Sequence, residues 1–89
     1  MKTEKLVQHL ADAVRRIGYT IRTEEGNFRG GRCTLVEEHI VFVNRRMTPD
    51  ERAGLFAQVL AAENLDGVFL LPEVRAYVEK SVAAQQNRE

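Results

Sequence analysis

The single cysteine and the two histidines are the side chains best suited to covalent or metal chemistry. Cys33 stands between Arg32 and Thr34, where a neighbouring guanidinium group favours a reactive thiolate. A catalytic thiol also needs a base beside it, and the spacing places neither His9 nor His39 next to Cys33. The alternative is a small buried side chain, the more common environment of a free cysteine. We therefore predict no catalytic residue, and a protein that is not an enzyme.

Metal ligands are too few in this sequence to predict a metal site. Zinc takes three or four ligands from histidine, cysteine and carboxylate side chains. Cys33 and His39 supply at most two of them across a hairpin, and neither a CxxC nor an HExxH motif is present. We expect neither a bound metal nor a cofactor.

The most unusual segment is a glycine–arginine stretch: Phe28, Arg29, Gly30, Gly31 and Arg32. Glycine-rich loops can present backbone N–H groups to a phosphate. The glycines here precede a predicted strand and not a helix, which excludes a P-loop and a dinucleotide-binding fingerprint. The segment is therefore either an anion-binding arm or the bulged arm of a hairpin.

A second candidate is the loop Asn44, Arg45 and Arg46, between an apolar strand and a helix start. Loops at such junctions often bind ligands, and arginine suits bidentate contacts with carboxylate or phosphate. Alternatively, Asn44 hydrogen-bonds its own loop, and the arginines pair with glutamates on a solvated sheet surface. The candidate binding residues are Phe28, Arg29, Gly30, Gly31, Arg32, Asn44, Arg45 and Arg46.

Helical periodicity and end signals predict three helices. The first, over 3–17, has Thr3 as its N-cap and Gly18 in the left-handed position beyond its end. The second begins at the capping box Thr48-Pro49-Asp50-Glu51 and ends near 64–67. The third extends from Pro72 to about residue 84, after a short link over 68–71 that is either an edge strand or a loop. Residues 85–89 are expected to fray.

Alternating or β-branched segments predict three strands, over 19–23, 32–37 and 40–43. A turn signal over 25–27 and a short link over 37–39 favour hairpin connections between them. We therefore predict one α+β domain over residues 1–89, in the order α-β-β-β-α-α. Its sheet is expected to be a three-stranded antiparallel meander packed with the three helices, with an open edge that could pair with a second chain.

Composition narrows the class of protein. The chain has 89 residues with 13 basic and 13 acidic side chains, so its net charge is zero and no basic excess points to nucleic acid. A lone cysteine suits a reducing compartment. No signal peptide and no apolar run near the ~20 residues of a membrane span are visible, so we expect a cytoplasmic protein without a membrane partner.

The segments Ile40–Asn44 and Leu55–Ala62 together resemble the strand–helix core of small HExxH zinc-metallopeptidase-like domains that accompany bacterial antitoxin-like regulators. In that family a strand ending in asparagine leads to a helix carrying Ala-His-Glu-Leu-Gly-His. Gln58, Val59 and Ala62 stand where the two histidines and the glutamate would be, so the metal motif is absent. The resemblance implies a similar scaffold without its chemistry, and no functional residue is carried over.

Two functions from different classes follow from the sequence. The first is a non-catalytic interaction module that self-associates or docks on a protein partner. The alternative is an anion- or nucleic-acid-binding domain that uses the arginine cluster on the sheet and the Asn44–Arg46 loop.

Overall fold

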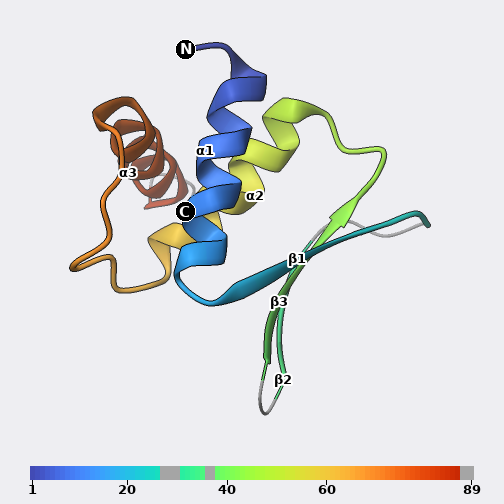
Figure 1. The fold of residues 1–89 in the computed structure, drawn as a ribbon. Helices are drawn as coiled ribbons and strands as arrows, with labels where there is room; N and C mark the ends of the chain where they lie inside the picture. Colours follow the sequence, from blue (N-terminus) through green and yellow to red (C-terminus); the bar gives the residue numbers. More distant parts are fainter. Residues whose placement is uncertain (27–30, 36–37, 87–89) are drawn as a thin grey trace.

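The computed structural model describes the backbone of residues 1–26, 31–35 and 38–86, and the side chains of residues 1–26 and 39–83. In chain order its elements are a helix, three strands and two helices (Figure 1). The prediction for residues 28–30 lies outside the described part, and so does the one for residues 87–89.

Helix α1 (Thr3–Arg16) forms where apolar residues recur at helical spacing. Leu10 and Val14 on this stripe are fully buried. The predicted cap is wrong: Lys2 is the N-cap, it makes no side-chain cap bond, and Thr3 is already helical. The end is as predicted, because Gly18 follows the helix with a φ of +103°, which glycine adopts without steric cost.

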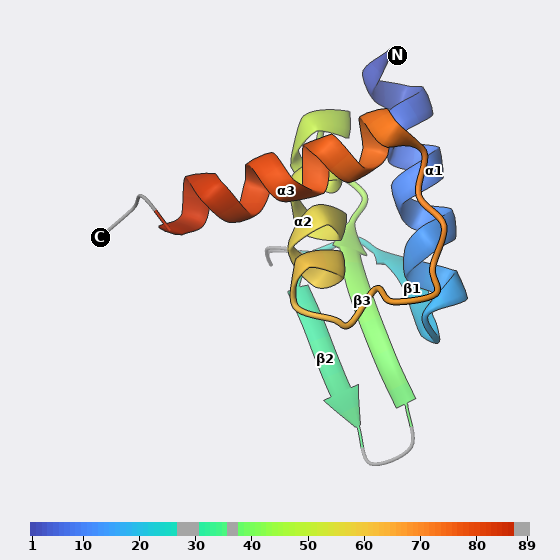
Figure 2. The same ribbon diagram turned by 90° about the vertical axis from the view of Figure 1, so that its left-hand side faces the viewer.

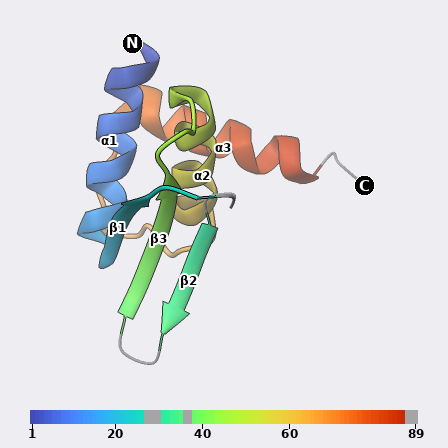
Figure 3. The same cartoon turned by 90° about the vertical axis from the view of Figure 1, so that its right-hand side faces the viewer.

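The sheet is mixed, so the predicted antiparallel meander is wrong. It contains β1 (Tyr19–Glu24), β2 (Gly31–Leu35) and β3 (Glu38–Asn44) in the spatial order β1-β3-β2 (Figure 3). Strand β2 pairs with β3 in the antiparallel sense, whereas β1 pairs with β3 in parallel.

The central position of β3 explains this difference. Ile40, Val41 and Val43 are buried. A strand this apolar is best placed in the middle of the sheet, where a neighbouring strand pairs with each of its two edges. The crossing between β1 and β2 joins two strand ends, Glu24 and Gly31, that both lie beside the carboxyl end of β3, while β1 and β2 themselves lie on opposite sides of that strand. The turn signal after β1 therefore belongs to this crossing and not to a hairpin.

Helix α2 (Pro49–Ala61) begins at the predicted capping box, which is confirmed. The Glu51 N–H donates to Oγ1 of Thr48 at 3.2 Å, and the Thr48 N–H donates to Oε1 of Glu51 at 2.8 Å. These bonds satisfy backbone donors that the first turn leaves free. The helix buries Phe56, Ala57 and Leu60 in the core.

Helix α3 (Pro72–Gln86) starts at the predicted proline and continues two residues beyond the predicted end. The link before it has no strand, and its residues point different ways. Leu70 is buried, whereas 69% of Phe69 is exposed. Val74 and Val78 attach the helix to the core.

The three helices lie on one side of the sheet, and the β2–β3 arm extends away from them (Figures 1 and 2). Alternate residues Val41 and Val43 of β3 join the core cluster with side chains from all three helices. Helix α1 packs against β1 and α2, and α3 crosses over α2. No helix in the described part of the chain has the length and apolar character that a membrane span requires.

Candidate functional site

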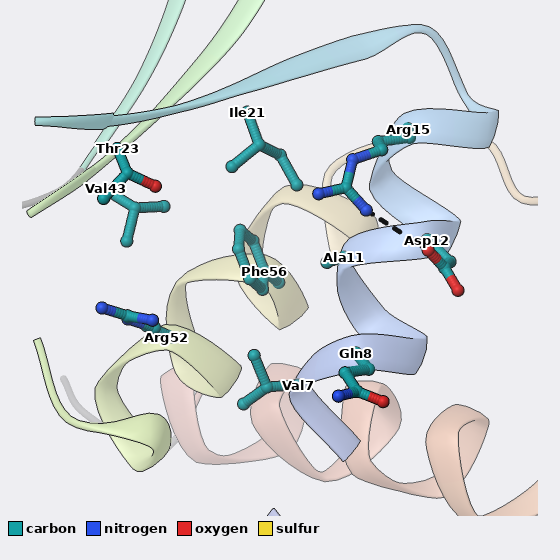
Figure 4. A pocket seen from close by; sticks show the side chains of 10 residues that line it. All are labelled: Val7, Gln8, Ala11, Asp12, Arg15, Ile21, Thr23, Val43, Arg52 and Phe56. Carbon is teal, nitrogen blue, oxygen red and sulfur yellow. Dashed lines mark hydrogen bonds and ion pairs between the residues drawn. The ribbon is translucent and has the colours of Figure 1, made fainter. Parts of the chain in front are cut away.

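A pocket of about 230 Å³ lies between α1, α2 and the inner face of the sheet, where β1 and β3 run side by side (Figure 4). Its apolar wall comes from both helices and both strands: Val7, Ala11, Ile21, Val43 and Phe56. Its polar groups are Gln8, Asp12, Arg15, Thr23 and Arg52. Apolar and polar residues contribute equally to this lining, so the pocket is more polar than most small-molecule sites, which are lined mainly by apolar side chains.

Arg52 is the most unusual group in this pocket. It lies on α2, one turn after Thr48 and one turn before Phe56, so the helix directs it toward the core side. Its Nη2 donates to the carbonyl oxygen of Arg45 at 3.0 Å. Its Nε is buried and has no hydrogen-bond partner, and no carboxylate pairs with the guanidinium, within the described residues. A buried N–H of this kind is costly, and a ligand oxygen reaches it only if neighbouring side chains shift, because the atom is closed to water-sized groups in this arrangement.

The loop after β3 fixes the carbonyl group that holds Arg52. Asn44 is 7% exposed; its Nδ2 donates to the carbonyl oxygen of Gly26 at 2.9 Å, and its Oδ1 accepts from the Arg46 N–H at 3.1 Å. The Arg45 N–H donates to the carbonyl oxygen of Glu24 at 2.8 Å. Asn44 thus ties the crossing after β1 to the loop before α2, and this network sets the position of the Arg45 carbonyl group.

The opposite end of the pocket carries a compensated charge. Nη1 of Arg15 contacts Oδ1 of Asp12 at 3.2 Å, one helical turn away, and both side chains are more than half exposed. Such a pair contributes little to stability because water and salt screen it. It nevertheless leaves Arg15 with a carboxylate neighbour, which Arg52 lacks among the described residues.

The structure places the predicted site residues in different surroundings. Phe28, Arg29 and Gly30 lie outside the described residues, and so does the side chain of Arg32. The backbone of Gly31 and Arg32 begins β2 and pairs with Phe42 and Val41. Whether this segment binds an anion stays a prediction. Of the loop residues, Asn44 is buried while Arg45 and Arg46 are exposed. Asn44 makes the loop-backbone contacts that were the alternative to ligand binding.

Glutamates accompany two of the exposed arginines that the structure describes, Arg22 and Arg45. Arg22 contacts Glu24 at 3.2 Å on β1, and Arg45 approaches Glu25 at 3.9 Å. These two arginines have glutamate neighbours, although Arg22 and Glu24 lie on one strand and not across two strands as predicted. This pairing lowers the local positive charge available to an anion at the loop surface.

Arg52 was not among the predicted site residues, although the sequence contains a signal for it. It precedes Phe56 by four and Val59 by seven positions, so it falls on the apolar stripe of its helix. A charged residue on a core-facing stripe is unusual, because burying a charge without a partner is unfavourable. Arg52 follows the polar residues of the capped first turn, so in the sequence it resembles one more exposed polar residue of the helix start.

The predictions about metal binding and about the Cys33 thiol can be compared with the structure only in part. In the described part of the chain, no group of three or more His, Cys, Asp and Glu residues is placed to hold a metal ion. The side chain of Cys33 lies outside it, so the predictions for that thiol stay open. His39 stacks at a tilt on Tyr19, with ring centroids 4.9 Å apart.

Comparison with protein-family models, with curated proteins and with solved structures gives no match to this chain. The resemblance to the zinc-metallopeptidase-like core stays a prediction. In the structure the positions that would carry its ligands lie in α2 and just after it, where Val59 is buried and Gln58 is exposed. The function is therefore argued from the pocket alone.

Proposed function

We propose that this chain is a non-catalytic binding module whose ligand is a small anion, held in the pocket between α1, α2 and the sheet. The observation that carries the proposal is the guanidinium group of Arg52, which lines the pocket and has no carboxylate partner in the described part of the chain. A guanidinium presents a fixed fork of N–H donors that matches carboxylate and phosphate oxygens.

The pocket favours a small ligand over a nucleic acid. Its volume of about 230 Å³ lies below the ~300–1,000 Å³ of sites for drug-sized molecules. The zero net charge of the chain also gives it no overall electrostatic attraction to a phosphate backbone. The anion-binding alternative from the sequence is thus kept, with Arg52 in place of the arm and loop arginines.

The proposal includes a cytoplasmic location, which the single cysteine supports, since reducing compartments keep thiols free. It includes no catalytic step: the described residues that line the pocket include no histidine, cysteine or serine, and the carboxylate of Asp12 is paired with Arg15.

An NMR titration tests the proposal directly. The Nε–H of Arg52 gives its own ¹⁵N–¹H signal, which we expect to move on addition of sodium acetate or sodium phosphate at constant ionic strength. Amides of Ala11, Ile21 and Phe56 should shift with the same dissociation constant. Arg52→Gln should abolish these shifts, while the matched control Arg75→Gln on the exposed side of α3 should keep them.

Two results would contradict the proposal. The first is the absence of any saturable shift at the pocket up to about 50 mM of either anion. The second is a saturable shift that survives Arg52→Gln but disappears in Arg45→Gln or Arg46→Gln. That pattern would place the anion on the loop surface, as the sequence alone predicted.

A second candidate function, self-association, is supported by the strand order. Strand β2 is an outer strand, and within the described residues it pairs with β3 alone, so a second copy could extend the sheet across this edge. The zero net charge opposes such contact only weakly. Light scattering after size exclusion, from 10 µM to 1 mM, should reveal a dimer; a monomer throughout this range would remove the candidate.

A further inference from the structure

The pocket has two chemically different ends and an apolar middle. Figure 4 shows Arg52 at one side, the Asp12–Arg15 pair at the other, and Ile21 and Phe56 between them. Phe56 is 3% exposed and belongs to the core, so this middle region is a rigid apolar wall. A ligand that extends from Arg52 toward Asp12 has to cross it.

The charges at the two ends favour one negative group and oppose a second. Arg52 has no carboxylate partner in the described part of the chain, so an anion beside it meets an uncompensated positive charge. Asp12, paired with Arg15 at 3.2 Å, adds a negative charge at the far end. A dianion that spans the pocket would place its second charge near this carboxylate, and like charges repel.

From these two features, and resting on the proposed function, we infer that the ligand is a monocarboxylate with a short apolar body. Its carboxylate lies at Arg52, its body covers the wall formed by Val7, Ile21 and Phe56, and its far end is neutral. Phosphate groups fit less well, because they carry about −1.5 to −2 charges at pH 7 and no apolar surface. Apolar contact should therefore add to affinity.

A ligand series separates this inference from the proposed function. Acetate, butyrate and hexanoate share the carboxylate and differ in apolar length. Hexanol lacks the charge, and adipate is a six-carbon chain with a second carboxylate. We expect affinity to rise about fourfold for each methylene that enters the pocket, which is the effect of burying one such group. Hexanoate should bind at least tenfold more tightly than acetate, adipate and hexanol.

Two variants assign the two halves of the ligand to their places. Arg52→Gln should remove binding of every carboxylate, while Arg52→Lys, which keeps the charge but not the fork, should weaken it by about tenfold. Val7→Phe, at a half-buried position, should fill the apolar middle. It should lower hexanoate affinity toward that of acetate, because the added ring occupies the space of the apolar chain. The amide spectrum of each variant reports whether its fold is intact.

The outcomes are distinguishable. Equal affinity for acetate and hexanoate, or tighter binding of adipate, would overturn the monocarboxylate while the anion site at Arg52 stands. Binding of hexanol as tight as that of hexanoate would show a purely apolar pocket and overturn both. No binding of any anion would remove the proposed function itself.

Discussion

Nη2 of Arg52 donates a hydrogen bond of 3.0 Å to the carbonyl oxygen of Arg45, so the loop after β3 holds the charged end of the pocket. The Nε–H of the same guanidinium is buried without a partner in the described part of the chain. A buried donor left unsatisfied costs about 1–3 kcal/mol, roughly what the bond to Arg45 returns. Stability and binding are therefore expected to separate at this position, as they often do at functional sites.

Arg52→Met tests this separation. Methionine keeps much of the side-chain length and removes the unsatisfied donor, so the free energy of unfolding should stay within about 1 kcal/mol of the parent or rise. Anion binding at the pocket should disappear. Urea unfolding followed by circular dichroism measures the first quantity, and the NMR titration measures the second. The control Arg75→Met should change neither by a measurable amount.

A loss of more than about 2 kcal/mol in Arg52→Met would contradict this interpretation. It would show that the hydrogen bond to Arg45 stabilises the fold, and that the guanidinium is structural. Retained anion binding in that variant would have the same meaning.

Asn44 is expected to be the most sensitive polar residue of the chain's described part. Asn44→Ala removes the donor to Gly26 and the acceptor for Arg46, so we expect a loss of about 2–3 kcal/mol in the free energy of unfolding. Asn44→Asp keeps an acceptor but directs a carboxylate at the Gly26 carbonyl oxygen, and it should be at least as destabilising at pH 7.

The matched control is Asn64→Ala. Oδ1 of Asn64 also accepts a bond from a backbone N–H two residues later, that of Asp66, but at an exposed position. We expect its removal to cost less than about 0.5–1 kcal/mol, since water replaces the lost partner. Equal losses in the two alanine variants would show that burial at the crossing after β1 is unimportant.

The sequence predicted local structure better than strand pairing, for a physical reason. Helix ends are encoded by nearby residues, as at Thr48 and Gly18, and these signals were correct. The pairing of strands depends on which strand is buried most completely by the core. The apolar strand β3 takes two partners, and a turn signal at Glu25 cannot distinguish a hairpin from a crossing. Asn44 could be selected from the sequence because it ends an apolar strand just before a helix. Its contact with Gly26 could not be predicted, because it depends on how the strands are ordered in the sheet.

The pocket was harder to predict because its parts are far apart in sequence. Arg15 and Asp12 come from α1, Ile21 from β1, and Arg52 from α2. Their convergence follows from the packing of α1 between β1 and α2, which no local pattern specifies. Only Arg52, as a charge on an apolar stripe, gave a signal that the sequence alone could have supplied.

The helix starts allow a paired test of capping. Thr48→Ala removes an observed side-chain cap and should lower the free energy of unfolding by about 1 kcal/mol. Thr3→Ala, at a threonine that the sequence also marked as a cap, should have almost no effect, because Thr3 is inside α1 and no side chain caps that helix. Thermal unfolding of both variants at one pH measures the difference. A comparable loss in Thr3→Ala would contradict the assignment of Lys2 as the N-cap.

The hydroxyl of Tyr19 donates a hydrogen bond to the Glu63 carboxylate, which joins the first residue of β1 to the turn after α2. Tyr19 is 5% exposed, so this bond is largely shielded from water. Tyr19→Phe keeps the ring contact with His39 and deletes only the donor. We expect it to lower the free energy of unfolding by about 1.5–3 kcal/mol, the range for hydrogen bonds to charged groups.

Glu63→Gln keeps an acceptor and removes the charge, so it should cost about half as much as Tyr19→Phe. The control is Tyr77→Phe, since Tyr77 on α3 is half-buried and makes no side-chain hydrogen bond within the described residues. Its loss should stay below about 0.5 kcal/mol. If Tyr19→Phe and Tyr77→Phe unfold at the same urea concentration, the bond between β1 and the end of α2 does not contribute to stability. The end of α2 would then be attached to the sheet by apolar contacts alone.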